Sequence, residues 1–252
     1  GRGEVGIATR PARLPMSPRS DTATPVAGGI VPPWRVLIVD DHPIVRTGLA
    51  ILIDAEPDMR SCGHAEDYDG ALQVLARDPP DLVLVDLSLR GSSGLELVKE
   101  VVRRGFRAIV VSMQEAPIWA ERAFAAGARG YVQKSEAGRN VVHAIRKVRA
   151  GRMYLSESIS GALLAHRVGG VASEDPNRRI ASLTDREIEV LARIGNGLTT
   201  RQIGAELRLS PKTVQTYRER IKRKLALGSA AELSREAARW VLETPPQAAR
   251  AD

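Results

Sequence analysis

The sequence contains a single cysteine, Cys62, and no run of apolar residues long enough to cross a membrane. One cysteine excludes an internal disulfide framework and every zinc site built from several cysteines. A membrane-spanning helix needs roughly 18 or more consecutive apolar residues, so we expect no membrane span. The first residues, "GRGEVGIATRPARLP", include arginines but no apolar core, unlike a secretory signal. These absences favour a protein of the reducing cytoplasm.

Basic residues outnumber acidic ones mainly in the C-terminal part of the chain. Residues 151–252 carry 17 Lys and Arg against 12 Asp and Glu, whereas residues 34–150 carry 16 of each. Within residues 208–224, "RLSPKTVQTYRERIKRK", seven basic residues accompany one acid, Glu219. A surplus this concentrated indicates a polyanionic partner, most often nucleic acid, although a solvated helix face is the alternative.

The hydrophobic pattern divides the chain into parts of different character. Residues 1–33 lack apolar periodicity, and we expect them to be disordered, as we do for residues 244–252. In residues 34–150, five apolar runs of strand length alternate with segments of helical spacing. The expected strands are residues 35–40, 59–65, 81–87, 107–113 and 130–134, and the expected helices are residues 43–55, 68–77, 94–104, 118–126 and 137–150. Five such units predict an α/β fold with a doubly wound parallel sheet. Residues 151–182 read as a partly helical linker, and residues 183–243 as a small all-helical domain.

Polar side chains follow the ends of the predicted strands. Asp40 and Asp41 end the first strand, Asp86 the third, Ser112 the fourth and Lys134 the fifth. The carboxyl ends of parallel strands meet at one edge of a sheet, so we expect these side chains to converge there. Asp41 alone could instead cap the following helix.

Three converging carboxylates repel one another unless a cation lies among them. Oxygen ligands favour a hard ion such as Mg²⁺, and a carboxylate beside the ion, such as Asp86, can act as a nucleophile toward phosphorus. Lys134 and Ser112 would then contact the phosphoryl group. We interpret His42 as an exposed neighbour of this pocket, and nothing in the sequence ties it to the metal.

Residues 35–150 resemble a CheY-like receiver domain of two-component signalling. The resemblance rests on "DDH" after the first strand, "VDLSL" after the third, "VSM" after the fourth and "GYVQKS" around the fifth. It implies that Asp86 is the phosphoacceptor and that Asp40 and Asp41 bind Mg²⁺ with it. It also implies a metal contact from the Ser88 backbone carbonyl and a switch role for Tyr131.

The C-terminal domain has the layout of a helix-turn-helix. "LTDREIEVL" opens with Thr184 as the expected cap and Glu187 three residues later, which is a capping box. Pro211 opens a longer helix, "PKTVQTYRERIKRKL", whose apolar residues are spaced to form one buried stripe. The residues of that stripe are Val214, Tyr217, Ile221 and Leu225.

Residues 183–242 resemble the output domain of LuxR/NarL/FixJ-type regulators. The matching text is "LTDREIEVL", "GLTTRQIGAELRLSPKTVQTYRERIKRKL" and "SAAEL", and "TYRERI" is similar to the subgroup that includes the GacA/UvrY and BvgA/EvgA regulators. The DNA-binding candidates are Lys212, Thr213, Gln215, Thr216, Arg218, Glu219, Arg220, Arg223 and Lys224. Leu233, Ala237 and Trp240 in the last helix either pair across a two-fold axis or close the domain core.

Together these patterns predict a DNA-binding response regulator that is not an enzyme. We expect a sensor histidine kinase to phosphorylate Asp86, with Mg²⁺ as cofactor, and the active form to be a homodimer that binds double-stranded DNA and RNA polymerase. In an alternative interpretation the receiver domain serves only for dimerisation and DNA binding is independent of phosphorylation. A phosphatase of the haloacid dehalogenase type is disfavoured, because His42 stands where that class has a second Asp.

Overall fold

The computed structural model of the chain describes residues 32–89, 93–114, 117–156, 159–161, 180 and 182–243. The expected disorder of residues 244–252 and of nearly all of residues 1–33 lies outside the described residues, as does most of the expected linker. No helix among the described residues is long and apolar enough to cross a membrane.

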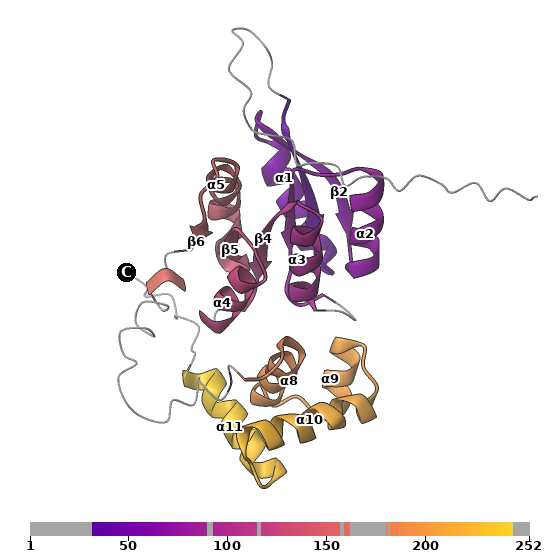
Figure 1. The fold of residues 1–252 in the computed structure, drawn as a ribbon, viewed down its shortest axis with the longest axis vertical. Coiled ribbons are helices and arrows are strands. Elements are labelled where there is room, and N and C mark those ends of the chain that lie inside the picture. The colour runs from indigo at the N-terminus through magenta and orange to yellow at the C-terminus, as the bar shows by residue number, and fades with distance from the viewer. Residues whose placement is uncertain are drawn as a thin grey trace, which may run out of the picture. The chain divides into compact units, whose positions relative to one another are not determined.

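Strands and helices alternate between Trp34 and Leu155, as the sequence predicts (Figure 1). The strands are β1 (Trp34–Val39), β2 (Met59–Ala65), β3 (Leu82–Val85), β4 (Arg107–Ser112), β5 (Gly130–Gln133) and β6 (Tyr154–Leu155). The helices are α1 (Pro43–Asp54), α2 (Tyr68–Arg77), α3 (Gly94–Arg103), α4 (Pro117–Ala125), the short 3₁₀ helix η1 (Lys134–Glu136) and α5 (Ala137–Arg149). The α/β prediction is therefore confirmed.

All strands pair in parallel in the order β2-β1-β3-β4-β5-β6. The chain crosses from β1 to β2 on one side and then to β3 on the other, so the strand order reverses between β1 and β3. A crevice at the carboxyl ends of these two strands is where ligands bind in doubly wound sheets. The strand β6 was not expected, because its two residues are too few to carry a periodic pattern and fall in the segment predicted as a linker.

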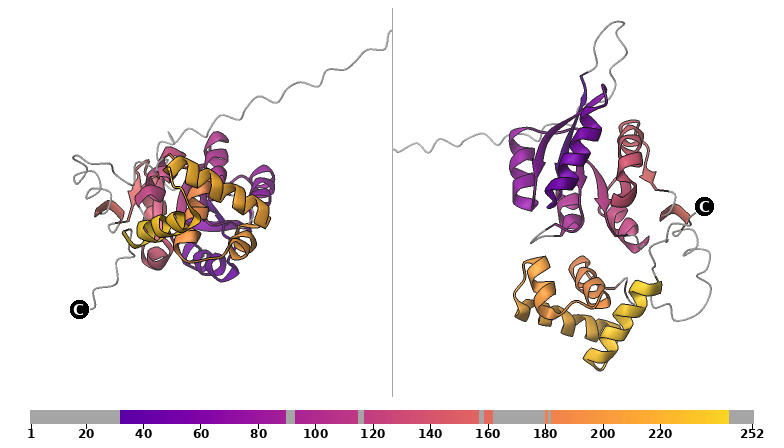
Figure 2. Two further views of the ribbon diagram at one scale, coloured as in Figure 1. Left: turned by 90° about the horizontal axis from the view of Figure 1, so that it is seen from below. Right: turned by 180° about the vertical axis from the view of Figure 1, so that it is seen from behind.

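Helices cover both faces of this sheet (Figure 2). Successive residues of a strand point to opposite faces. In β1, Val36 and Ile38 join the core cluster formed with α1 and α5, whereas Leu37 and Val39 join the cluster that includes α2, α3 and α4. Burial on both faces explains why the central strands are apolar almost throughout.

The C-terminal part of the described chain is helical. Its helices are α8 (Asp185–Gly195), α9 (Thr200–Leu207), α10 (Pro211–Leu225) and α11 (Ala230–Glu243). The predicted capping box at Thr184 and Glu187 is present, and Thr199 with Gln202 forms a second one at the start of α9. A Cβ atom on Gly195 would lie 2.4 Å from the Ala237 carbonyl oxygen, so glycine permits the close packing of α8 against α11.

Candidate metal centre and nucleic-acid interface

The ends of β1 and β3 position the three carboxylates of the pocket. Asp40 and Asp41 follow β1 directly, and Asp86 follows β3. The Asp86 amide donates to the Val39 carbonyl oxygen at 2.9 Å, and the Asp40 amide donates to the Ala65 carbonyl oxygen at 3.2 Å. These bonds continue the sheet one residue beyond its strands, so the two carboxylates project from ordered backbone.

The three carboxylates are buried close together. Asp40, Asp41 and Asp86 are 1%, 8% and 2% exposed, and one ligand atom from each, with one from His42, lie within 4.8 Å of one another. Burial of unpaired carboxylates is costly, and like charges at this separation add to the cost. The arrangement therefore requires positive charge.

Lys134 supplies part of that charge. Its Nζ atom lies 2.7 Å from Asp40 Oδ2 and 2.7 Å from Asp86 Oδ2, and its side chain is 7% exposed. Burial raises the pKa of Asp86 above its ordinary value; Lys134 opposes this shift and Asp40 adds to it. Burial would lower the pKa of Lys134, but attraction to Asp86 and Asp40 outweighs it, so that pKa is raised.

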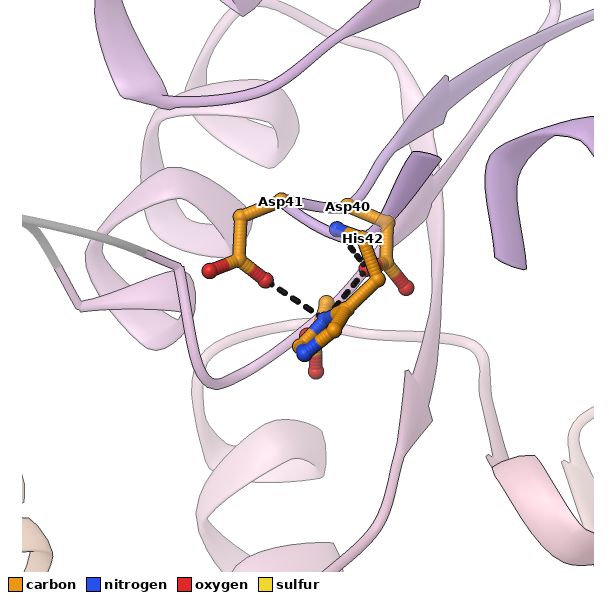
Figure 3. Close-up of side chains that lie close together, drawn as sticks. Asp40, Asp41 and His42 are labelled. Carbon is orange, nitrogen blue, oxygen red and sulfur yellow. Dashed lines mark hydrogen bonds and ion pairs between the residues drawn. The ribbon is translucent and has the colours of Figure 1, made fainter. Parts of the chain in front are cut away.

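His42 also contacts the pocket (Figure 3). Its Nδ1 atom lies 2.7 Å from Asp41 Oδ1 and 3.1 Å from Asp40 Oδ1, while the side chain is 58% exposed. His42 is thus an exposed neighbour of the pocket, as interpreted from the sequence, and its imidazole in addition bridges two of the carboxylates. Its position directly after the two aspartates was the available signal, but the direction of a side chain at a strand end does not follow from sequence.

The donor set fits a divalent hard cation. When ionised, three carboxylates and one ammonium leave the pocket with a net charge of −2, since three negative charges meet one positive charge. Carboxylate oxygens are the ligands that Mg²⁺ prefers. Asp40, Asp41 and Asp86 could hold such an ion. The Ser88 amide donates to Asp86 Oδ1 at 3.2 Å, which brings Ser88 to the same carboxylate.

The two predicted switch residues bind the same residue of the β4–α4 loop. Ser112 and Tyr131 are both 0% exposed. The Gln114 amide donates to Ser112 Oγ at 3.1 Å, and the Tyr131 hydroxyl donates to the Gln114 carbonyl oxygen at 2.6 Å. The two backbone polar groups of Gln114 are thus held by side chains of the adjacent strands β4 and β5.

The candidate recognition helix is α10. The Ser210 hydroxyl caps it by accepting from the Thr213 amide at 3.0 Å, and Pro211 occupies its first turn. Val214, Ile221 and Leu225 are buried and Tyr217 is half-buried, so the predicted stripe faces the domain interior. Of the DNA-binding candidates, Lys212, Gln215, Thr216, Glu219, Arg220, Arg223 and Lys224 are exposed, and Thr213 and Arg218 are half-buried.

Lys224 has a structural partner that the sequence did not reveal. Its Nζ atom lies 2.6 Å from Oε2 of Glu187, a carboxylate only 3% exposed, and 3.4 Å from the Ser182 carbonyl oxygen. Glu187 Oε2 also accepts from the Thr184 amide at 2.7 Å. The pair joins the C-terminal end of α10 to the start of α8, and a DNA contact by Lys224 stays a prediction.

The last helix contributes to the domain core. Leu233, Ala237 and Trp240 are 0%, 0% and 5% exposed, and α11 packs against α8. Of the two interpretations of these residues, burial favours core closure over pairing across a two-fold axis, because side chains that are buried within one chain offer no surface to a second.

Known proteins match both parts of the chain. Residues 36–146 match the response regulator receiver domain, and residues 181–237 match the bacterial regulatory proteins of the luxR family. The chain is 35% identical to the response regulator GacA of Pseudomonas aeruginosa, over 79% of this chain and 93% of that protein. It is 32% identical to the response regulator UvrY of Escherichia coli, over 81% of this chain and 94% of that protein. A solved LuxR-family two-component response regulator from Aurantimonas sp. matches 54% of this chain and 99% of its own with a TM-score of 0.52 and 34% identity.

Proposed function

The chain belongs to the NarL/FixJ family of two-component response regulators, and we propose that phosphorylation of Asp86 by a sensor histidine kinase controls its dimerisation and its binding to promoters. The family consists of DNA-binding transcription regulators, and a DNA-binding regulator of this kind would work in the cytoplasm. The observation that carries the proposal is the pocket in which Lys134 Nζ lies 2.7 Å from both Asp40 and Asp86.

Asp86 is the candidate nucleophile. One of its oxygens would form a bond to the phosphorus of a phosphohistidine in the kinase, while the phosphorus–nitrogen bond breaks and the imidazole leaves. Lys134, already beside the Asp86 carboxylate, would pair with the new phosphoryl oxygens. Bound Mg²⁺, held by Asp40, Asp41, Asp86 and the Ser88 carbonyl, would neutralise phosphoryl charge.

The bonds to Gln114 suggest how the signal leaves the pocket. If the Ser112 side chain moved to donate its hydroxyl hydrogen to a phosphoryl oxygen, the hydrogen bond that Ser112 Oγ accepts from the Gln114 amide would lengthen or break. The Tyr131 hydroxyl donates to the Gln114 carbonyl oxygen, so movement of the loop would also change this hydrogen bond. A difference of a few kcal/mol between two arrangements of this loop changes their populations strongly. We propose that this shift promotes dimerisation.

Helix α10 is the proposed DNA-reading element. Its exposed amide, hydroxyl and guanidinium groups can contact base edges and phosphates in a major groove. We retain Lys212, Thr213, Gln215, Thr216, Arg218, Glu219, Arg220, Arg223 and Lys224 as candidate DNA contacts, and RNA polymerase as a candidate partner of the bound regulator.

Intact-protein mass after incubation with acetyl phosphate and Mg²⁺ tests the proposal. We expect one added phosphoryl group on the wild-type chain and on Asp69→Asn, an exposed aspartate of α2 that serves as the control. We expect none on Asp86→Asn or Asp41→Ala. An Asp86→Asn variant labelled like the wild type would refute the assignment of the acceptor. The reaction should be quenched early enough to exclude rapid loss of the phosphoryl group. If the wild type is still unlabelled, the better account is that the protein binds DNA independently of phosphorylation.

A further inference from the structure

One acidic side chain lies in the middle of the basic outer face of α10. Val214, Ile221 and Leu225 point inward, and Glu219 lies on the opposite side of the helix with Lys212 and Arg223. The Glu219 side chain is 55% exposed. A carboxylate that enters the major groove would be repelled by the DNA backbone, so this position disfavours binding unless the carboxylate finds a hydrogen-bond donor there.

Neighbours along the helix hold the Glu219 carboxylate in place. Gln215 Nε2 donates to Glu219 Oε1 at 2.9 Å, and Lys222 Nζ lies 2.8 Å from Glu219 Oε2. The hydrogen bond from Lys222 keeps the pKa of Glu219 below its ordinary value, so the group is ionised at neutral pH. Each carboxylate oxygen can accept further hydrogen bonds.

Of the four bases, only cytosine presents this carboxylate with a donor and no acceptor of its own. In the major groove, guanine presents two acceptors and thymine one, and both repel a carboxylate. Adenine presents an amino donor beside the N7 acceptor, whereas cytosine presents its N4 amino group alone. A fixed, ionised carboxylate therefore discriminates in favour of cytosine.

We propose that Glu219, positioned by Gln215, determines sequence specificity by accepting a hydrogen bond from a cytosine amino group in each half-site. This inference rests on the proposed role of α10 as the recognition helix. It assigns Glu219 to direct base reading, and it separates Glu219 from the basic residues around it, whose phosphate contacts would not depend on sequence.

The simpler account is that Glu219 only stabilises α10. Pairs at i,i+3 and i,i+4, such as those with Lys222 and Gln215, stabilise helices modestly. In that case neutralising Glu219 would leave every base preference unchanged. The two accounts therefore predict different base preferences at one position of the DNA site, the position that Glu219 would contact.

Selection from random DNA distinguishes them. The full chain, treated with acetyl phosphate and Mg²⁺, would be incubated with duplexes containing a random stretch of about 20 base pairs, two helical turns. Wild type would be compared with Glu219→Gln and with Glu206→Gln. Glu206 on α9 is the matched control, because its side chain is 51% exposed and also forms an ion pair, with Arg193 at 2.9 Å.

We expect the wild type and Glu206→Gln to select cytosine at one fixed position of each half-site. In Glu219→Gln the preference for cytosine should fall by about 5- to 20-fold, and the other base preferences should remain. This fold-change corresponds to the lower part of the range of discrimination for good side-chain contacts to bases. Lys222→Met, which removes the intrahelical partner but keeps the carboxylate, should retain the preference for cytosine.

Three results would overturn the inference. They are an unchanged cytosine preference in both Glu219→Gln and Glu219→Ala, a wild type that enriches a sequence without cytosine at any fixed position, and a loss in Lys222→Met equal to that in Glu219→Gln. Failure of the proposed function looks different, because then the wild type and Glu206→Gln would enrich no sequence at all. Matching circular dichroism spectra would exclude misfolding, and Glu219→Ala should reproduce the selective loss.

Discussion

Replacing Lys134 by methionine removes the ammonium group that lies between two buried carboxylates. Its Nζ atom is 2.7 Å from Asp40 and 2.7 Å from Asp86, with side-chain exposures of 7% for the lysine and 2% for each aspartate. Methionine is similar in length and apolar, so the substitution deletes charge with little loss of volume. Asp40, Asp41 and Asp86 would then face one another with no ammonium between them.

The expected loss of stability is large. Removing one partner of a buried ion pair costs about 3–5 kcal/mol, because the remaining charge stays buried. We take about 3 kcal/mol, since protonation of one carboxylate relieves part of the repulsion. At a urea slope of about 1.5 kcal/mol/M, this loss lowers the unfolding midpoint by roughly 2 M. A divalent cation would replace the missing charge, and at 100 times its Kd it would restore about 2.7 kcal/mol.

Urea unfolding with EDTA or with Mg²⁺ measures both effects. In a Trp240→Phe background the tryptophan fluorescence comes from Trp34 in β1 and Trp119 in α4, so it reports on the receiver domain. The control is Lys147→Met, which removes an amine from α5 outside the pocket. If Lys134→Met in EDTA stays within about 0.5 kcal/mol of the wild type, which is typical of a surface substitution, our account of the pocket charge is wrong.

Other substitutions test other parts of the structure. Arg220→Ala should weaken DNA binding for all sequences and reduce the slope of log affinity against log salt by about 1; an unchanged slope would exclude a phosphate contact. Burial opposes ionisation of Glu187, but the hydrogen bond from Lys224 prevails and lowers its pKa below the ordinary 4.5. The stabilisation by Glu187 is therefore complete above that pH and lost on further acidification, so the stability difference between wild type and Glu187→Gln should shrink between pH 6 and pH 3.5. A Cβ atom on Gly94 would lie 2.1 Å from the Asp86 carbonyl oxygen, so Gly94→Ala should displace that backbone and reduce acetyl phosphate labelling; normal labelling would show that the loop adapts.

The fold and the acidic pocket could be predicted because both follow from short patterns and one topological rule. Apolar runs of strand length alternating with helical spacing predict the succession of strands and helices and a parallel sheet. The carboxyl ends of parallel strands share one edge of the sheet, so residues after the first and third strands are expected to converge there, and in the structure these two strands are neighbours. The convergence of Asp40, Asp41, Asp86 and Lys134 needed no knowledge of any distance.

The contacts of His42 and Lys224 could not be predicted in this way. Each depends on the direction of a side chain or on how two helices cross, and neither leaves a periodic signal. A lysine on a basic helix contributes the same charge to a count made from the sequence whether it contacts a DNA phosphate or a carboxylate of its own domain. Lys224 meets Glu187 at 2.6 Å, and Lys222 meets Glu219 at 2.8 Å. Either lysine would have to exchange that partner before neutralising a phosphate, so the seven basic residues of residues 208–224 give an upper bound on the phosphate contacts of this segment. The salt dependence of DNA binding should accordingly be weaker than that count implies.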